Sequence, residues 1–371
     1  SFLIPSPPPS FLFADVHISF ASSLPSMASL KSVAFALASL NLAASTDLPS
    51  LPSVNETDLT VSGLSSGGFM AVQMHVAYSA RFRGAGVFAG GPWYCAQGQE
   101  TTALVTCMST PFMLNVDNLV SLTHSAVQDG NVDAVTNMKD DKIWIFSGSK
   151  DSVVKQEVVK KLEQYYQSFI TADGAIKTNY TTPSEHAFPT TDFGNWCWWK
   201  GAPYINNCHF DGAAAMMEHL YGAAEVSTTK AGTGKLIQFD QSAFFPSGKN
   251  WGGLSMGSTG YLYVPAKCAA AGGAKKGSCG LHVALHGCQQ TLADIGTKYV
   301  ENTGINAWAD AHDLVVLYPQ ATKSMLSNPE GCWDWWGYTD GNYAHKSGQQ
   351  PTVIMAMVDH ILGKKVETIV V

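Results

Sequence analysis

A short run of residues, 63–67, constrains the fold of this chain more than any other segment. It reads Gly-Leu-Ser-Ser-Gly, follows a β-prone stretch at 59–61 and precedes a helical pattern at 68–78. A strand that turns sharply into a helix holds the serine at a strained corner, and the glycines let the strand and helix approach. A chance Gly/Ser-rich loop would have the same letters, but the flanking patterns favour the sharp turn. We therefore predict Ser65 as a nucleophile, with the N–H of Ser66 beside a developing oxyanion.

Apolar runs that read as buried strands alternate with helical patterns along the chain. The expected strands are 143–146, 281–285 and 314–318, with edge strands at 236–239 and 260–264. The expected helices are 153–169, 212–221 and 353–362. This alternation predicts an α/β fold with a mainly parallel sheet and helices on both faces.

A serine hydroxyl needs a base, and the base needs a carboxylate that fixes its tautomer. In the α/β-hydrolase fold the three groups occur in the order serine, acid, histidine. Asp151 fits the acid, because it lies in the loop that follows the expected strand 143–146. The alternative is an ordinary N-cap aspartate before the helical pattern 153–169.

Eleven histidines compete for the role of base. We predict His186, which lies in a loop after a further expected strand around 178–182. His209 is an open alternative, whereas His219 falls within an apolar helical pattern and is expected to pack in the fold. Chain order excludes the histidines that precede the predicted acid: His17, His75 and His124.

The stretch 281–288 reads as a strand that ends in a His-Gly-Cys turn, the kind of segment that supplies a second oxyanion N–H. The predicted oxyanion donors are therefore the N–H groups of Ser66 and Cys288. His282 and His286 share a strand face, so a metal pair is conceivable. No third ligand is evident, and hydrogen-bonded structural histidines are the favoured interpretation.

The position of this turn in the chain predicts a circular permutation. In most esterases of the α/β-hydrolase fold the oxyanion turn precedes the nucleophile, whereas here it follows the whole predicted triad. Residues 235–371 would then carry the usual first half of the fold, and residues 46–224 the usual second half. The small, polar stretch 222–234 would link the original ends, which usually lie close together at the surface.

The beginning of the chain predicts secretion. Residues 27–45 contain Met27, Lys31, an apolar core at 33–42 and a small-residue end, which is the layout of a signal peptide. The apolar core is too short to anchor the protein in a membrane. Residues 1–26 begin without methionine and are rich in Pro and Ser, so we expect them to lie outside the catalytic domain, 46–371.

Cysteines and sequons agree with a secretory route. Three pairs of cysteines are separated by only 11 or 12 positions, which suggests local disulfides, although spacing alone leaves the connectivity open. Asn55 and Asn179 begin glycosylation sequons. The eight cysteines are Cys95, Cys107, Cys197, Cys208, Cys268, Cys279, Cys288 and Cys332.

The charge of the chain argues against nucleic acid as a partner. The formal net charge is −7, only 14% of residues are charged, and no basic cluster is present. We expect a monomer that needs neither a metal nor an organic cofactor.

The run Cys332-Trp333-Asp334-Trp335-Trp336 places three tryptophans within four residues. We expect Trp333 to pack in the core. A bridge between Cys288 and Cys332 would bring the run beside the oxyanion turn and make Trp335 a wall for an apolar acyl chain. Trp336 could have either role.

Several segments together resemble the secreted polyhydroxybutyrate depolymerases, in particular their single-domain, circularly permuted type. The resemblance rests on the stretches 61–70, 86–92, 281–290, 314–321 and 331–335 and on the spacing of the cysteines. It implies a serine esterase that hydrolyses poly(3-hydroxybutyrate) or a related aliphatic polyester. It also implies that neighbouring cysteines pair in order.

The resemblance assigns the same site residues as the motifs do. The implied triad is Ser65, Asp151 and His186, the implied oxyanion donors are Ser66 and Cys288, and the implied subsite aromatic is Trp335. The segment 195–200, Asn-Trp-Cys-Trp-Trp-Lys, is bulkier and more aromatic than the family pattern, so we expect it to reshape the substrate crevice.

Two other functions compete with polyester hydrolysis. A feruloyl or acetyl-xylan esterase would use the same scaffold and the same triad. A catalytically silent secreted binding protein on a hydrolase fold is the alternative from a different class.

Overall fold

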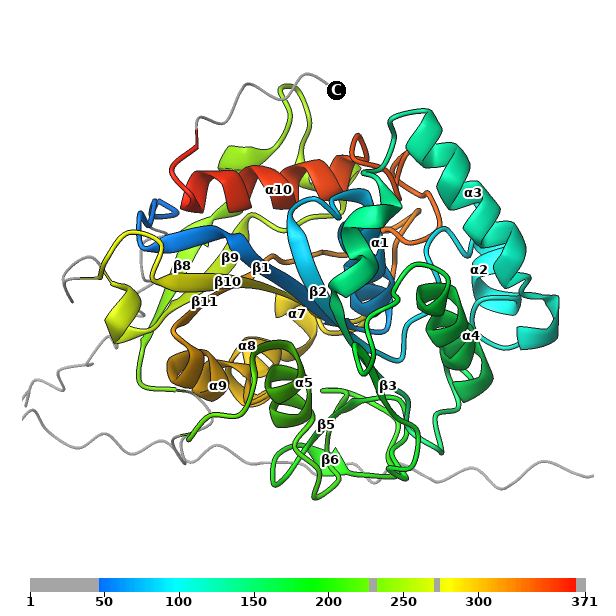
Figure 1. Ribbon diagram of the computed structural model, residues 1–371, viewed down its shortest axis with the longest axis horizontal. Coiled ribbons are helices and arrows are strands. Elements are labelled where there is room, and N and C mark those ends of the chain that lie inside the picture. Colours follow the sequence, from blue (N-terminus) through cyan, green and yellow to red (C-terminus); the bar gives the residue numbers. More distant parts are fainter. Residues whose placement is uncertain (1–46, 227–231, 270–273, 365–371) are drawn as a thin grey trace, which may run out of the picture. The chain divides into compact units, whose positions relative to one another are not determined.

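An eight-stranded, mainly parallel sheet runs through the computed structural model (Figure 1). The structure describes residues 47–226, 232–269 and 274–364, all of which belong to one compact unit. The predicted signal peptide, the preceding 1–26 extension and residues 227–231 of the predicted linker lie outside the described residues.

The strands of this sheet follow the order β4-β3-β2-β1-β10-β11-β9-β8. The pairs of β9 with β8 and with β11 are antiparallel, and the other pairs of this sheet are parallel. In chain order the strands are β1 (Val54–Leu64), β2 (Phe82–Phe88), β3 (Lys142–Phe146), β4 (Ile176–Asn179), β8 (Lys235–Asp240), β9 (Thr259–Val264), β10 (Cys279–Leu285) and β11 (Leu314–Tyr318).

This strand order is that of a circularly permuted α/β-hydrolase. The first strand of the chain, β1, lies in the middle of the sheet, and β2 to β4 proceed from it to one edge. The chain then crosses to the opposite edge at β8 and returns through β9 until β10 pairs with β1. The strand before the nucleophile turn and the strand before the His-Gly-Cys turn are therefore neighbours, although more than 200 residues separate them.

The central strands form where the sequence is continuously apolar, because helices cover both of their faces. All five residues of β11 and all seven of β10 are buried. The expectation of two edge strands was half wrong: β8 lies at the edge, whereas β9 is paired on both sides, with β8 and β11. Residues 260–264 of β9 are all buried, as an interior position requires.

Helices cover the two faces of the sheet, with α1 and α10 on one side and α5 and α9 on the other (Figure 1). The α-helices are α1 (Ser66–Ala77), α2 (Glu100–Val105), α3 (Val116–Gln128), α4 (Gln156–Gln167), α5 (Gly212–Tyr221), α6 (Trp251–Leu254), α7 (Leu292–Ile295), α8 (Lys298–Asn302), α9 (Ile305–His312) and α10 (Gln349–Ile361). Short 3-10 helices are η1 (Pro111–Met113), η2 (Val135–Asp140), η3 (Gln241–Phe244) and η4 (Ala266–Cys268). Among the described residues, no helix is long and apolar enough to cross a membrane.

A second, small sheet was not predicted. It contains β5 (Phe188–Thr190), β6 (Asn195–Trp196) and β7 (Ile205–Asn207), in the order β5-β7-β6. The Cys197–Cys208 disulfide lies within this segment and joins two cysteines that are 11 residues apart in sequence. Strands of two or three residues have no usable periodicity, so local patterning does not reveal them.

The eight cysteines form four disulfides, and they pair in sequence order as the family resemblance implies. Three bridges close loops of 11 or 12 residues, and Cys288–Cys332 spans 44. The bridges are Cys95–Cys107, Cys197–Cys208, Cys268–Cys279 and Cys288–Cys332.

Candidate active site

Ser65 occupies the sharp turn between β1 and α1. Its φ of 57° and ψ of −122° are unusual for a residue other than glycine, and its N–H donates to the carbonyl oxygen of Phe88 at 2.8 Å. A Cβ on Gly63 would lie 2.1 Å from the carbonyl oxygen of Gly67, and a Cβ on Gly67 would lie 2.3 Å from that of His286. The two glycines of the motif are therefore required by close backbone approaches on both sides of the serine.

Asp151 and His186 form a buried pair at the carboxyl end of the sheet. Asp151 follows β3, and its Oδ2 lies 2.9 Å from Nδ1 of His186, which follows β4. The other carboxylate oxygen, Oδ1, accepts the N–H groups of Val153 and Val154 at 2.9 Å each. The capping role and the contact with histidine thus coexist, each on its own oxygen. The helix α4 begins at Gln156 rather than at the predicted 153, and Lys155, the residue before it, donates its N–H to the carbonyl oxygen of Met108.

The loops of this pair are also joined by Glu185. Its Oε2 accepts the N–H of Ser152 at 3.1 Å and the N–H of His186 at 2.6 Å. One carboxylate therefore links the residue after the predicted acid to the predicted base.

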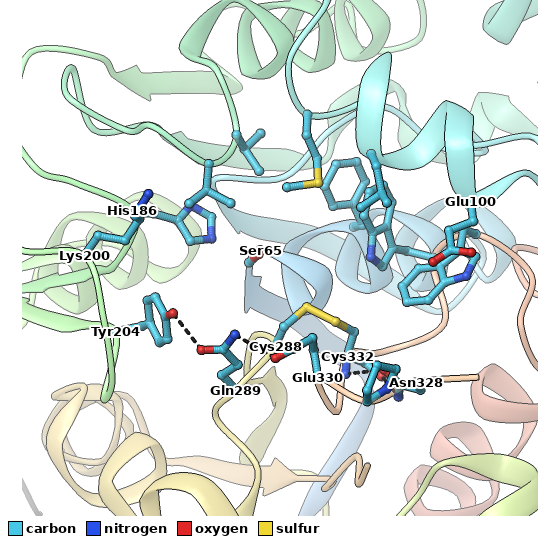
Figure 2. A pocket seen from close by; sticks show the side chains of 18 of the residues that line it. Ser65, Glu100, His186, Lys200, Tyr204, Cys288, Gln289, Asn328, Glu330 and Cys332 are labelled. Atoms are coloured by element: carbon cyan, nitrogen blue, oxygen red, sulfur yellow. Dashed lines mark hydrogen bonds between the residues drawn. A yellow bond between two sulfur atoms is a disulfide. The ribbon is translucent and has the colours of Figure 1, made fainter. Parts of the chain in front are cut away.

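Ser65 and His186 line the same cavity, which has a volume of about 460 Å³. Figure 2 shows Ser65 between the imidazole of His186 on one side and the Cys288–Cys332 disulfide on the other. His209, the alternative base, is exposed and does not line this cavity. His219 lies in α5, where it is buried and hydrogen-bonds the carbonyl oxygen of Ala175.

The His-Gly-Cys turn after β10 passes directly over the nucleophile. A Cβ on Gly287 would lie 3.3 Å from the Cβ of Ser65, and Cys288 lines the cavity. Within the described part of the chain, the N–H groups of Ser66 and Cys288 donate to no protein acceptor. An oxyanion hole requires such unengaged N–H groups; Cys288 lines the cavity, whereas Ser66 is buried beside the nucleophile.

One wall of the cavity is aromatic. Trp335 is only 5% exposed and stacks on Phe69, with ring centroids 4.2 Å apart, and Trp336 also lines the cavity. Trp333 is fully buried and does not line it. The run keeps its shape because the buried carboxylate of Asp334 accepts backbone N–H groups from the following turn, those of Trp336, Gly337, Tyr338 and Thr339.

A polar chain on the opposite rim was missed by sequence reasoning. The hydroxyl of Tyr204 donates to Oε1 of Gln289 at 2.8 Å, and Nε2 of Gln289 donates to Glu330 at 2.7 Å (Figure 2). Burial, together with the charge of Glu330, raises the pKa of Tyr204, so its hydroxyl stays protonated. The only sequence signal was the position of Gln289 directly after the predicted oxyanion residue.

The aromatic segment 195–200 does not shape the cavity as expected. Of this segment only Lys200 lines the cavity. Trp196, Trp198 and Trp199 instead form an exposed cluster, with exposed fractions of 68%, 59% and 49% and neighbouring rings 5.2 and 5.9 Å apart. The Cys197–Cys208 disulfide holds this segment against β7, which directs the indoles outward.

His282 in β10 and His286 directly after it have hydrogen-bond partners rather than a metal-binding arrangement. His282 contacts the hydroxyls of Thr60 and Ser62, both at 2.7 Å. Burial lowers the pKa of His282 to about 3 and that of His286 to about 4, so both rings are neutral at ordinary pH. The described residues contain no group of three or more His, Cys, Asp or Glu that could hold a metal ion.

No protein-family model matches the chain. Individual known proteins are nevertheless similar to it over most of its length. The poly(3-hydroxybutyrate) depolymerase of Delftia acidovorans is 47% identical over 320 residues, which cover 86% of this chain and 62% of that protein. The chain thus spans less than two thirds of that relative's length. The polyhydroxybutyrate depolymerase of Talaromyces funiculosus is 38% identical over 335 residues, 86% of this chain and 93% of that one.

Solved structures agree with these relatives. A PHB depolymerase with a serine-to-alanine substitution, complexed with an R3HB trimer, superposes with a TM-score of 0.75 and 36% identity. The crystal structure of PHB depolymerase from Penicillium funiculosum gives a TM-score of 0.74 and 36% identity. Each comparison covers 86% of this chain and 99% of the solved one.

Proposed function

Because this chain belongs to the polyhydroxybutyrate depolymerase family, we propose that it is a serine esterase that hydrolyses poly(3-hydroxybutyrate) or a related aliphatic polyester. The observation that carries the proposal is one cavity in which Ser65 faces His186, with Asp151 bonded to the far nitrogen of that histidine. The polyester as substrate rests on the relatives, one of which was solved with an R3HB trimer.

In the proposed mechanism, Oγ of Ser65 attacks the ester carbonyl carbon and gives its proton to Nε2 of His186. Asp151 holds the Nδ1 proton and stabilises the imidazolium. The negative charge on the carbonyl oxygen is stabilised by the N–H groups of Ser66 and Cys288. Each such donor is worth roughly 3–4 kcal/mol in the transition state.

Collapse of the tetrahedral intermediate breaks the ester C–O bond, and His186 protonates the departing alkoxide. The acyl group stays on Ser65 until a water, deprotonated by His186, attacks it and releases the acid. Every step of the proposed reaction uses only side chains, backbone N–H groups and water. Trp335 is proposed to hold the apolar part of the acyl chain, because it lines the cavity in a rigid stack with Phe69.

The identity of the products distinguishes polyester hydrolysis from the second candidate, a feruloyl or acetyl-xylan esterase. The purified protein is expected to release 3-hydroxybutyrate or its short oligomers from polymer films and to clear a polymer suspension. A feruloyl or acetyl-xylan esterase would instead release ferulate or acetate from plant cell-wall material. Faster release of ferulate or acetate than of hydroxybutyrate, at matched enzyme and ester concentrations, would overturn the proposed substrate class.

We also propose that the protein acts outside the cell as a monomer. Four disulfides require an oxidising compartment. Asn55 and Asn179 are proposed glycosylation sites, because each asparagine is partly exposed and, within the described residues, its side chain hydrogen-bonds only its own sequon and the next residue. Neither nucleic acid nor a membrane is part of this proposal.

The exposed tryptophan cluster is expected to attach the enzyme to solid polyester. Replacing Trp196, Trp198 and Trp199 together with alanine should weaken adsorption to polymer films by about tenfold or more. A tenfold loss of affinity is about 1.4 kcal/mol, which burial of only about 60 Å² of apolar surface against the polymer would supply. The kcat/KM for a soluble short-chain ester should stay unchanged, because none of the three indoles lines the cavity.

A film-binding isotherm measures this effect, and Phe112→Ala is the matched control. Phe112 is an 86% exposed aromatic residue in η1, outside the cluster. Equal adsorption by wild type and the triple variant, or an equal loss with the control, would contradict a binding role for the cluster.

A further inference from the structure

His286, the last residue before the Gly287–Cys288 turn, is bonded at both ring nitrogens. The backbone N–H of Ala321 lies 3.1 Å from Nε2, and Nδ1 lies 2.7 Å from the carbonyl oxygen of Gly287. A backbone N–H can only donate, so Nε2 accepts and carries no proton. Nδ1 therefore carries the proton and donates it to Gly287. Both partners specify a single neutral tautomer of the ring.

The bond to Gly287 also determines the direction of a neighbouring N–H. The carbonyl of Gly287 and the N–H of Cys288 belong to one planar, trans peptide group, so they point in opposite directions. The ring of His286 is fully buried behind the turn, whereas Cys288 lines the cavity with Ser65. Holding the carbonyl toward His286 therefore aims the N–H of Cys288 toward the cavity.

This control matters because the turn pivots on a glycine. The space at Gly287 is tight, since a Cβ would lie 3.1 Å from the carbonyl oxygen of Leu64 and 3.3 Å from the Cβ of Ser65. Glycine permits many backbone conformations, and a rotated 287–288 peptide would present a carbonyl rather than an N–H to the oxyanion. The preceding peptide has its own support, because the N–H of Gly287 donates to Oε1 of Gln290 at 2.6 Å.

We propose that His286 is a positioning residue for the oxyanion hole: its Nδ1–H holds the 287–288 peptide so that the N–H of Cys288 faces the nucleophile. This inference rests on the proposed function and adds a specific role to a histidine outside the triad. If His286 were purely structural, variants would lose activity only to the extent that they lose stability. If it is a positioning residue, variants lose activity when the bond from Nδ1 to Gly287 is lost and keep it when only the bond from Ala321 is lost.

Two substitutions separate these bonds. The amide nitrogen of an asparagine reaches the place of Nδ1 and can still donate to Gly287, but it leaves the N–H of Ala321 without an acceptor. The amide oxygen of a glutamine reaches the place of Nε2 and can still accept from Ala321, but it loses the donor to Gly287. Each variant therefore keeps one bond and loses the other.

With a soluble short-chain ester, H286Q is expected to lower kcat by about 10- to 100-fold, up to the loss seen when one oxyanion donor is removed. Its KM should change by less than about threefold, since the donor acts mainly in the transition state. Affinity for a boronic acid that mimics the tetrahedral intermediate should fall in parallel with kcat. H286N should keep kcat within about threefold of wild type, because the bond to Gly287 persists.

All rates are expressed per active site titrated with a fluorophosphonate, and melting temperatures are recorded for each variant. The matched control is H219N, whose shorter amide does not reach the place of Nε2 and therefore loses another buried imidazole bond to a backbone carbonyl, that of Ala175 in a part of the fold away from the cavity. It should lower the melting temperature without changing kcat.

The proposal is overturned if H286Q keeps the wild-type kcat, or if H286N loses as much activity as H286Q. If H286Q does not fold, H286N decides: a kcat within threefold of wild type supports the proposal, and a loss above tenfold overturns it. Absence of ester hydrolysis in the wild-type protein would instead contradict the proposed function itself, so the two failures are distinguishable.

Discussion

Ser65→Ala is expected to lower ester hydrolysis by about 10⁵-fold or more while the protein remains folded. The substitution removes one oxygen and leaves the backbone of the turn intact, including the bond from the Ser65 N–H to Phe88 and the bond from the Phe69 N–H to the Ser65 carbonyl. Without that oxygen no acyl-enzyme can form, so only catalysis by the remaining groups would persist.

The measurement is initial-rate hydrolysis of a soluble ester, with fluorophosphonate labelling followed by mass spectrometry. Ser121→Ala is the matched control, since Ser121 lies on the exposed side of α3 and its hydroxyl bonds only the carbonyl of Asp117. Wild type and the control should react at residue 65 and turn over equally. Undiminished turnover by Ser65→Ala would remove the mechanism, and an inert, unlabelled wild type would favour the silent binding protein.

Asp151→Asn is expected to lower kcat by about 10⁴-fold, the size of effect seen when a triad aspartate becomes an amide. Oδ1 of Asp151 accepts two backbone N–H groups, so an asparagine would keep its carbonyl oxygen there and turn its NH₂ toward His186. That donor would force Nδ1 of His186 to accept and would leave the proton on Nε2. An imidazole protonated at Nε2 cannot take the proton of Ser65.

Asp141→Asn provides the control for this variant. Asp141 forms a second buried pair with a histidine, Oδ2 to Nε2 of His75 at 3.1 Å, and neither residue lines the cavity. Both variants should lose thermal stability, but only Asp151→Asn should lose activity per titrated site. A kcat for Asp151→Asn within tenfold of wild type would contradict the assigned role.

Much of the fold was predictable because each central element has a local signature. The predicted strand 314–318 and helix 212–221 match β11 and α5 to the residue, since continuous apolar runs and helical periodicity reflect burial directly. The boundary of α4 and the edge position assigned to β9 were wrong. At both places the chain contacts a distant partner: the carbonyl of Met108, which Lys155 bonds just before α4, and β11 beside β9.

The site divides in the same way. The sequence at 63–67 predicts the strained turn because its glycines and serine lie within five residues. Chain order, together with a position in a loop after an expected strand, selected Asp151 and His186. The bond from Tyr204 to Gln289 joins residues 85 positions apart. The outward direction of the indoles at 196–199 follows from a small sheet and a disulfide that no local pattern predicts.

Short sequence patterns thus identified the residues that carry reactive groups and the strands that precede them. A strained turn or an apolar strand depends on only a few consecutive residues. Tertiary structure alone decided how those groups face one another. Pairing of β1 with β10 brings the turn at Gly287 over Ser65. The buried ring of His286 then orients a peptide whose carbonyl, in a free chain, would bond to water as readily as to a histidine.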